Sequence, residues 1–202
     1  GVTSVLATLG VGLGAYELVN FGKEVIDTGA KLETLNNVIK YTSIDTADAA
    51  ANHEFLTRVI EQYKLPLEST MEGFSGLSAA MIGTKLQGQG ARDVFEGVSV
   101  AATAMHLNAE KTNAVFYALN NMMSNGTVQA QDLKLQLGNA LPGAFNLAAK
   151  SMGVTTVELT KMMKNGELVS SDFLPKFAEY LKKEFGAAIP NAVKSTVALQ
   201  TE

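Results

Sequence analysis

The chain has 202 residues, a net charge of −4 and no cysteine. Its content of 47% hydrophobic and 18% charged residues is typical of a globular protein and excludes wholesale disorder. Without cysteine there can be no disulfide, thiolate metal site or redox pair. No segment is strongly basic, and this argues against nucleic-acid binding, because phosphate contacts supply much of that affinity.

The first 22 residues, GVTSVLATLGVGLGAYELVNFG, are apolar and carry one charge, Glu17. This segment is nearly long enough to span a bilayer, but its glycines and threonines keep the hydrophobicity low. A packing helix with close glycine contacts is the alternative interpretation. The GVGLGA within it has the outline of a dinucleotide-binding turn, yet such a turn needs alternating strands and helices, and nothing downstream indicates a strand.

Apolar residues recur at helical spacing through the rest of the chain, which predicts an all-α fold. The spacing predicts a long helix over 16–42, a second helix from a cap at Asp45 to about Tyr63, and a third that Pro66 opens. The stretch QGQGARD indicates a break, and a helix of small residues is predicted over 91–105. Its alanines, glycines and serines suit close contact with other helices.

In the second half, capping residues, glycines and prolines divide the chain into short helices. The predicted boundaries are Asn108 and Gly126, Pro142 and Gly153, a capping box of Thr155 and Glu158, a stop at Gly166, and a start at Ser170 or Ser171. Two apolar stripes are predicted to face inward: Leu133, Leu137 and Leu141, and Leu174, Phe177, Leu181 and Phe185. Helices this short are marginal alone, so we expect a compact multi-helix bundle behind a longer N-terminal helical region.

One sequence pattern occurs twice, forty residues apart. NMMSNGTVQAQDLKLQLGNAL covers 121–141 and KMMKNGELVSSDFLPKFAEYL covers 161–181. Each copy predicts a helix, a glycine stop, a linker and a second helix. Two copies are too few to define a solenoid, so we interpret the repeat as a corner used twice to fold short helices into a bundle.

The sequence offers no residue set that indicates catalysis or cofactor binding. Its two histidines, His53 and His106, lack the spacing of metal ligands, and no second histidine supports a serine nucleophile. The acidic residues are scattered and do not define a carboxylate pair. We therefore predict no catalytic residue, no cofactor-binding residue and no metal site.

The stretch AAKSMGVTTVELTKMMKNG, residues 148–166, supports an alternative function. Its turn and second helix resemble a helix-turn-helix, in which the second helix reads the DNA major groove. That helix offers only Lys161 and Lys164 as cations, with Glu158 near its start. A helical corner used for packing explains the stretch equally well, and both interpretations stay open.

Three ordered stretches resemble the tape-measure domain found near the N-terminus of phage tail length tape-measure proteins. They are QLGNALPGA at 136–144, SMGVTTVEL at 151–159 and GELVSSDFLPK at 166–176. The preceding VFEGVSVAATAMHLNAEKTNAVFYALNNMMSNG is also similar to the family. We therefore expect a helical N-terminal region over 1–90, which can belong to the same domain, the tape-measure domain over 91–186, and the start of a following helix over 187–202.

The resemblance implies a structural protein of a phage or prophage tail, assembled in the bacterial host cytoplasm, whose long helical remainder fixes tail length. It implies the tail tube, tail tip and tail assembly chaperone proteins as partners, with self-association as a further option. It implies no enzymatic activity, no small-molecule substrate and no nucleic acid, and membrane contact only at infection. We expect the chain to be an excerpt of a longer protein, because it opens on Gly1 and its last stretch, NAVKSTVALQTE, stops within a predicted helix. Because glycine and proline stops recur from Gly126 onward, we expect it to be a folded module at one end of the tape and not a ruler by itself.

Overall fold

The computed structural model describes residues 25–200, and it describes side chains over 29–194. Its elements are α3 (Val25–Thr42), α4 (Thr46–Tyr63), α5 (Leu67–Ala80), α6 (Gln89–Ala104), α7 (Ala109–Asn125), the π-helix η1 (Gln131–Leu137), α8 (Gly138–Ala140), α9 (Ala144–Met152), α10 (Thr156–Lys164), α11 (Ser170–Phe185), the 3-10 turn η2 (Gly186–Ala188) and α12 (Ile189–Gln200). Over these residues no strand forms, so the all-α prediction is confirmed. The apolar opening, GVGLGA and the start of the predicted helix 16–42 lie outside the described residues.

The helix boundaries follow local capping chemistry. Asp45 caps α4 and Asn108 caps α7, each accepting a hydrogen bond from the backbone N–H three residues on. The predicted capping box Thr155–Glu158 forms at the start of α10. One boundary differs from the prediction: α9 begins two residues after Pro142, because Gly143 first turns the backbone in the left-handed conformation, with φ +77°.

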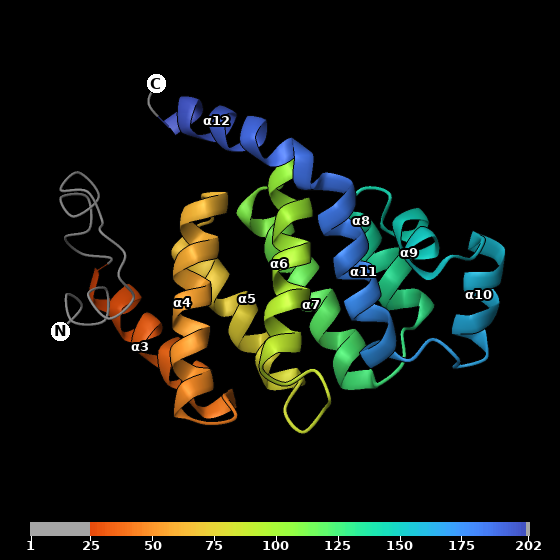
Figure 1. The fold of residues 1–202 in the computed structure, drawn as a ribbon, viewed down its shortest axis with the longest axis horizontal. Coiled ribbons are helices and arrows are strands. Elements are labelled where there is room, and N and C mark those ends of the chain that lie inside the picture. Colours follow the sequence, from red (N-terminus) through yellow and green to blue (C-terminus); the bar gives the residue numbers. More distant parts are fainter. Residues whose placement is uncertain (1–24, 201–202) are drawn as a thin grey trace.

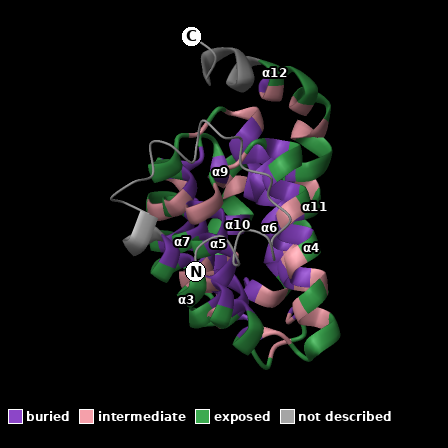
Figure 2. Ribbon diagram, turned by 90° about the vertical axis from the view of Figure 1, so that its left-hand side faces the viewer, coloured by how far each residue is buried: buried purple, intermediate pink, exposed green. Residues whose placement is uncertain are grey.

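The helices pack in two layers along the long axis of the molecule (Figure 1). One layer contains α4, α6 and α11, and the other contains α3, α5 and α7, continued by η1 and α9. Helix α10 lies at the far end from α3, and α12 crosses along one edge. Buried residues gather in the interior of the bundle, and exposed residues cover its outside (Figure 2).

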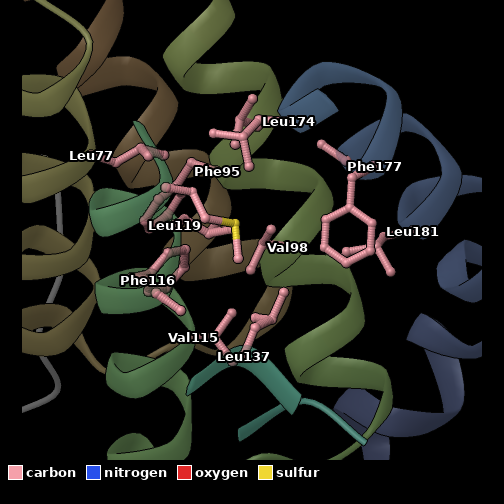
Figure 3. Packing of buried hydrophobic residues seen from close by; sticks show 14 of the residues in the cluster. Leu77, Phe95, Val98, Val115, Phe116, Leu119, Leu137, Leu174, Phe177 and Leu181 are labelled. Carbon is pink, nitrogen blue, oxygen red and sulfur yellow. The ribbon is translucent and has the colours of Figure 1, made fainter. Parts of the chain in front are cut away.

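Four buried phenylalanines join the two layers. Phe95 of α6 stacks on Phe116 of α7, with ring centroids 4.3 Å apart, and meets Phe74 of α5 edge-on at 5.3 Å. Phe55 of α4 lies 5.5 Å from Phe74. Figure 3 shows Phe95 and Phe116 among the aliphatic side chains that surround them. The described parts of the chain before and after residue 90 thus share one hydrophobic core.

Helix α6 is the centre of the bundle. Every residue from Val94 to Thr103 is buried, so the helix has no solvent-exposed face over this stretch. Its small residues let a neighbouring backbone approach closely: a Cβ atom added at Gly97 would lie 2.3 Å from the carbonyl oxygen of Ala178 in α11. The inward stripe of α11, which includes Phe177, packs against α6 on the side where Gly97 lies (Figure 3).

The two copies of the sequence repeat contact each other. Gly126 and Gly166 each end a helix in the left-handed conformation, with φ +74° and +69°. The linkers that follow pair as an antiparallel bridge: the N–H of Val128 donates to the carbonyl of Leu168 at 2.8 Å, and the N–H of Ser170 donates to the carbonyl of Gly126 at 3.0 Å. The repeat therefore builds one shared corner, in which each linker satisfies backbone groups of the other.

Gly97→Ala is expected to lower the free energy of unfolding by about 1 to 3 kcal/mol, because the added Cβ meets the backbone of α11, which cannot rotate away. Urea unfolding followed by circular dichroism measures the change. Gly186→Ala is the matched control, since it has helical φ of −57° and a Cβ there would meet nothing within 4 Å. Equal losses in the two variants would contradict the close approach of α6 and α11.

Candidate interaction surface

A cluster of charges ties three helices together. Glu96 of α6, whose side chain is 10% exposed, accepts hydrogen bonds from Arg58 of α4 at 2.6 Å, from the Tyr63 hydroxyl at 3.0 Å and from Lys182 of α11 at 2.8 Å. The two cations are about half exposed and keep part of their hydration. The cluster thus holds α4 and α11 against α6, next to the contact between Gly97 and the backbone of α11.

The hydrogen bonds of the cluster fix its protonation. Burial alone would raise the pKa of Glu96, but the hydrogen bonds from Arg58, Lys182 and Tyr63 outweigh burial and lower that pKa to about 2. Burial, and then the charge of Glu96, raise the pKa of Tyr63 to about 12. At neutral pH the carboxylate is charged and the phenol is neutral, so neither group is suited to accept and return protons in catalysis.

The two histidines are on different elements and do not form a ligand pair. His53 of α4 is half-buried; burial, and then the charge of Lys40, lower its pKa. His106 is exposed in the turn after α6. Within residues 25–200, no three histidine or acidic side chains converge as metal ligands, and no helix is long and apolar enough to cross a membrane.

A groove of about 340 Å³ opens between α5 and α7, lined by Glu72, Gly73, Gly76, Asn113, Phe116, Tyr117 and Asn120. Its floor depends on two glycines, because a Cβ would lie 2.6 Å from the Phe116 ring at Gly73 and 2.4 Å from the Asn120 amide at Gly76. Tyr117 beside it is 62% exposed. Sequence reasoning missed this groove, which forms only when α5 and α7 pack.

The corner between α9 and α10 is an exposed end of the molecule (Figure 1). Gly153 joins the two helices in the left-handed conformation, with φ +68°. On α10 only Leu159 and Met163 are buried. Lys161 and Lys164, the cations of the helix-turn-helix alternative, lie exposed on its outer face. The outer face of α10 is thus exposed and accessible to a binding partner.

These features define an all-α structural module with a clamped core and two surfaces open to partners. The family model described as "Tape measure protein" matches residues 23–200. The chain is also similar to a protein named "Probable tape measure protein" from Salmonella phage Felix O1 (isolate Felix O1-VT1), with 31% identity over 165 residues. That alignment covers 82% of this chain and 22% of the relative. The chain therefore belongs to the tape measure protein family of phage tail structural proteins.

The family assignment confirms the resemblance that the sequence motifs indicated between 91 and 186, and the match extends it to residue 23. It gives the helix-turn-helix alternative no support. No solved structure matches the chain. The chain spans 22% of the length of its tape-measure relative, so most of that relative has no counterpart here.

Glu96→Gln is expected to lower the free energy of unfolding at neutral pH by about 2 to 3 kcal/mol, because it removes the charge that three donors hold. The folded-state pKa of about 2 lies below the ordinary value of 4.5. The contribution of Glu96 is therefore complete above about pH 5 and is lost as the pH falls toward 2.

Urea unfolding of both proteins between about pH 7 and about pH 3 tests this prediction, and the stability difference should shrink as the solution becomes acid. Glu61→Gln changes an exposed carboxylate on α4 and should leave stability within about 0.5 kcal/mol of the wild type. A Glu96→Gln difference that stays constant across this pH range would show that the charge does not stabilise the fold.

Proposed function

We propose that this chain is a folded, non-catalytic module of a phage tail tape-measure protein, and that it takes part in tail assembly and in setting tail length through protein contacts. The observation that carries the proposal is the family match over residues 23–200. The identity to a named tape measure protein over 82% of the chain supports it. The cluster around Glu96 adds support for a structural role, because its groups hold one protonation state at neutral pH.

In this proposal the module is an anchor of the tape and does not itself measure length. A continuous α-helix rises about 1.5 Å per residue and is suited to be a ruler. Left-handed glycines at 126, 143, 153 and 166 instead fold this chain back into a bundle. The length-setting helix would then belong to the remainder of a longer parent protein, as the coverage of 22% of the relative suggests.

The proposed partners are the tail tube, tail tip and tail assembly chaperone proteins, and the proposed location is the virion tail after assembly in the host cytoplasm. Two surfaces of the module support a binding role. The α5–α7 groove exposes an aromatic ring, and α10 has a largely exposed outer face. Exposed apolar side chains at such places are typical of surfaces that bind other proteins.

Titration calorimetry with the purified tail tube, tail tip and chaperone proteins of the same phage tests the proposal. The 202-residue chain is expected to bind at least one of them with a Kd below about 100 μM. Glu61→Gln should bind equally well, whereas Gly97→Val, which forces α6 and α11 apart, should bind more weakly. Absence of binding to all three proteins would contradict the proposal.

A further inference from the structure

We propose that Asn165 is a site of spontaneous covalent modification, at which the side-chain amide is lost and isoaspartate or aspartate forms, whereas the equivalent Asn125 is protected by the fold. An Asn-Gly pair occurs twice in the chain, at 125–126 and at 165–166, once in each copy of the repeat. The two pairs have the same chemistry, but the structure gives them different surroundings. This inference goes beyond the proposed function and depends on no other tail protein.

The reaction is a ring closure within the Asn-Gly pair. The backbone nitrogen of the glycine attacks the Cγ atom of the asparagine, so that a new N–Cγ bond closes a five-membered succinimide and the Cγ–Nδ2 bond breaks. The proton of the glycine N–H ends on the leaving nitrogen, which departs as ammonia. Water then opens the ring at either carbonyl and gives aspartate or isoaspartate. Glycine favours the attack, because no Cβ shields its nitrogen.

The helical backbone opposes this reaction at both pairs. The N–H of Gly126 donates to the carbonyl of Met123 at 3.1 Å. The N–H of Gly166 donates to the carbonyl of Met163 at the same distance. All four residues of the two pairs are exposed, so exposure does not distinguish them. Attack requires the helix end to open, and the rate therefore depends on how often each end opens.

Two non-local contacts hold the Asn125–Gly126 pair closed. The amide nitrogen of Asn125 donates at 3.2 Å to Asp132 of η1, which is 5% exposed. The carbonyl of Gly126 accepts the N–H of Ser170 at 3.0 Å, so this glycine is itself part of the bridge between the two linkers. Opening the end of α7 therefore separates it from η1 and breaks the bridge.

The Asn165–Gly166 pair is held by local contacts. Its amide nitrogen donates at 3.0 Å to the exposed Glu167, two residues further along the chain. The N–H of Glu167 donates at 2.9 Å to the carbonyl of Met162, within the same end of α10. On this side the bridge begins at Leu168, outside the Asn-Gly pair. The end of α10 can therefore open while the bridge stays intact.

The two helices that carry the pairs also differ in burial. Helix α7 has 17 residues, of which seven are buried. Helix α10 has nine residues, of which only Leu159 and Met163 are buried, and it lies at one end of the molecule (Figure 1). A short helix with few buried contacts frays more readily than a long one in the core. Asn165 is therefore expected to react first.

The product changes the surface of α10. The reaction adds a negative charge at the C-terminal end of the helix, where the helix dipole disfavours one. The new carboxylate has no N–H to donate, so the hydrogen bond to Glu167 is lost and two like charges stand together. The last turn of α10 loosens, and the outer face beside Lys161 and Lys164 becomes more negative.

Mass spectrometry of proteolytic peptides, after incubation of the 202-residue chain in mildly alkaline buffer, tests the inference. In the folded chain, isoaspartate and aspartate are expected to form at Asn165 at least about fivefold faster than at Asn125, whose exposure to attack requires further hydrogen bonds to break. In concentrated urea the fold is lost, and the two pairs should react at similar rates. Equal rates in the folded chain, or a faster reaction at Asn125, would overturn the inference.

Two variants test the cause of the difference. Asp132→Ala removes the buried acceptor of the Asn125 amide and should speed the reaction at Asn125 alone, provided that circular dichroism shows the variant to be folded. Asn165→Gln is the control, because its longer side chain closes a ring more slowly, and it should leave the rate at Asn125 unchanged. An unchanged Asn125 rate in folded Asp132→Ala would also contradict the inference. The wild-type comparison between buffer and urea needs neither variant.

Discussion

The approach of α6 to α11 at Gly97 is the constraint on which the rest of the structure depends. Successive residues of an α-helix point in different directions. Three consecutive residues of α6 therefore contact different neighbouring helices. Phe95 enters the aromatic contacts with α5 and α7, Glu96 holds the charges of α4 and α11, and Gly97 meets the backbone of α11. A helix buried on every side organises both layers, and the small residues of its sequence make that burial sterically feasible.

The core of the bundle has a structural part in our proposal, and the partners would bind at the surface. The buried carboxylate of Glu96 is held ionised by its three donors, so it holds α4 and α11 against α6 and does not exchange a proton near neutrality. The α5–α7 groove depends on Gly73 and Gly76 of α5, where an added Cβ would collide with α7, just as a Cβ at Gly97 would collide with α11. A tape-measure module of this kind would present defined binding surfaces because its core allows little rearrangement.

The sequence predicted those parts of the fold that depend on local chemistry. Caps such as Asp45 and Asn108, and the stop at Gly126, involve residues within one helical turn, and each lies where the spacing placed it. The contacts of Glu96 could not be predicted, because Arg58 and Lys182 are 38 and 86 residues away along the chain. The bridge between the two repeat linkers and the α5–α7 groove are non-local in the same way. The π-helical form of η1 was also not predicted, although its leucine stripe is buried as expected.

Electron microscopy of tails from a phage whose tape-measure gene lacks the segment equivalent to 25–194 would test the central claim, that this module is an anchor and not a part of the ruler. If the account is correct, tails will be few or absent, and those that form will not be shorter in proportion to the deletion. If the segment lies extended in the ruler, complete tails will form in normal numbers and will be shorter by roughly 250 Å, about 1.5 Å for each residue removed. That second result would contradict the account.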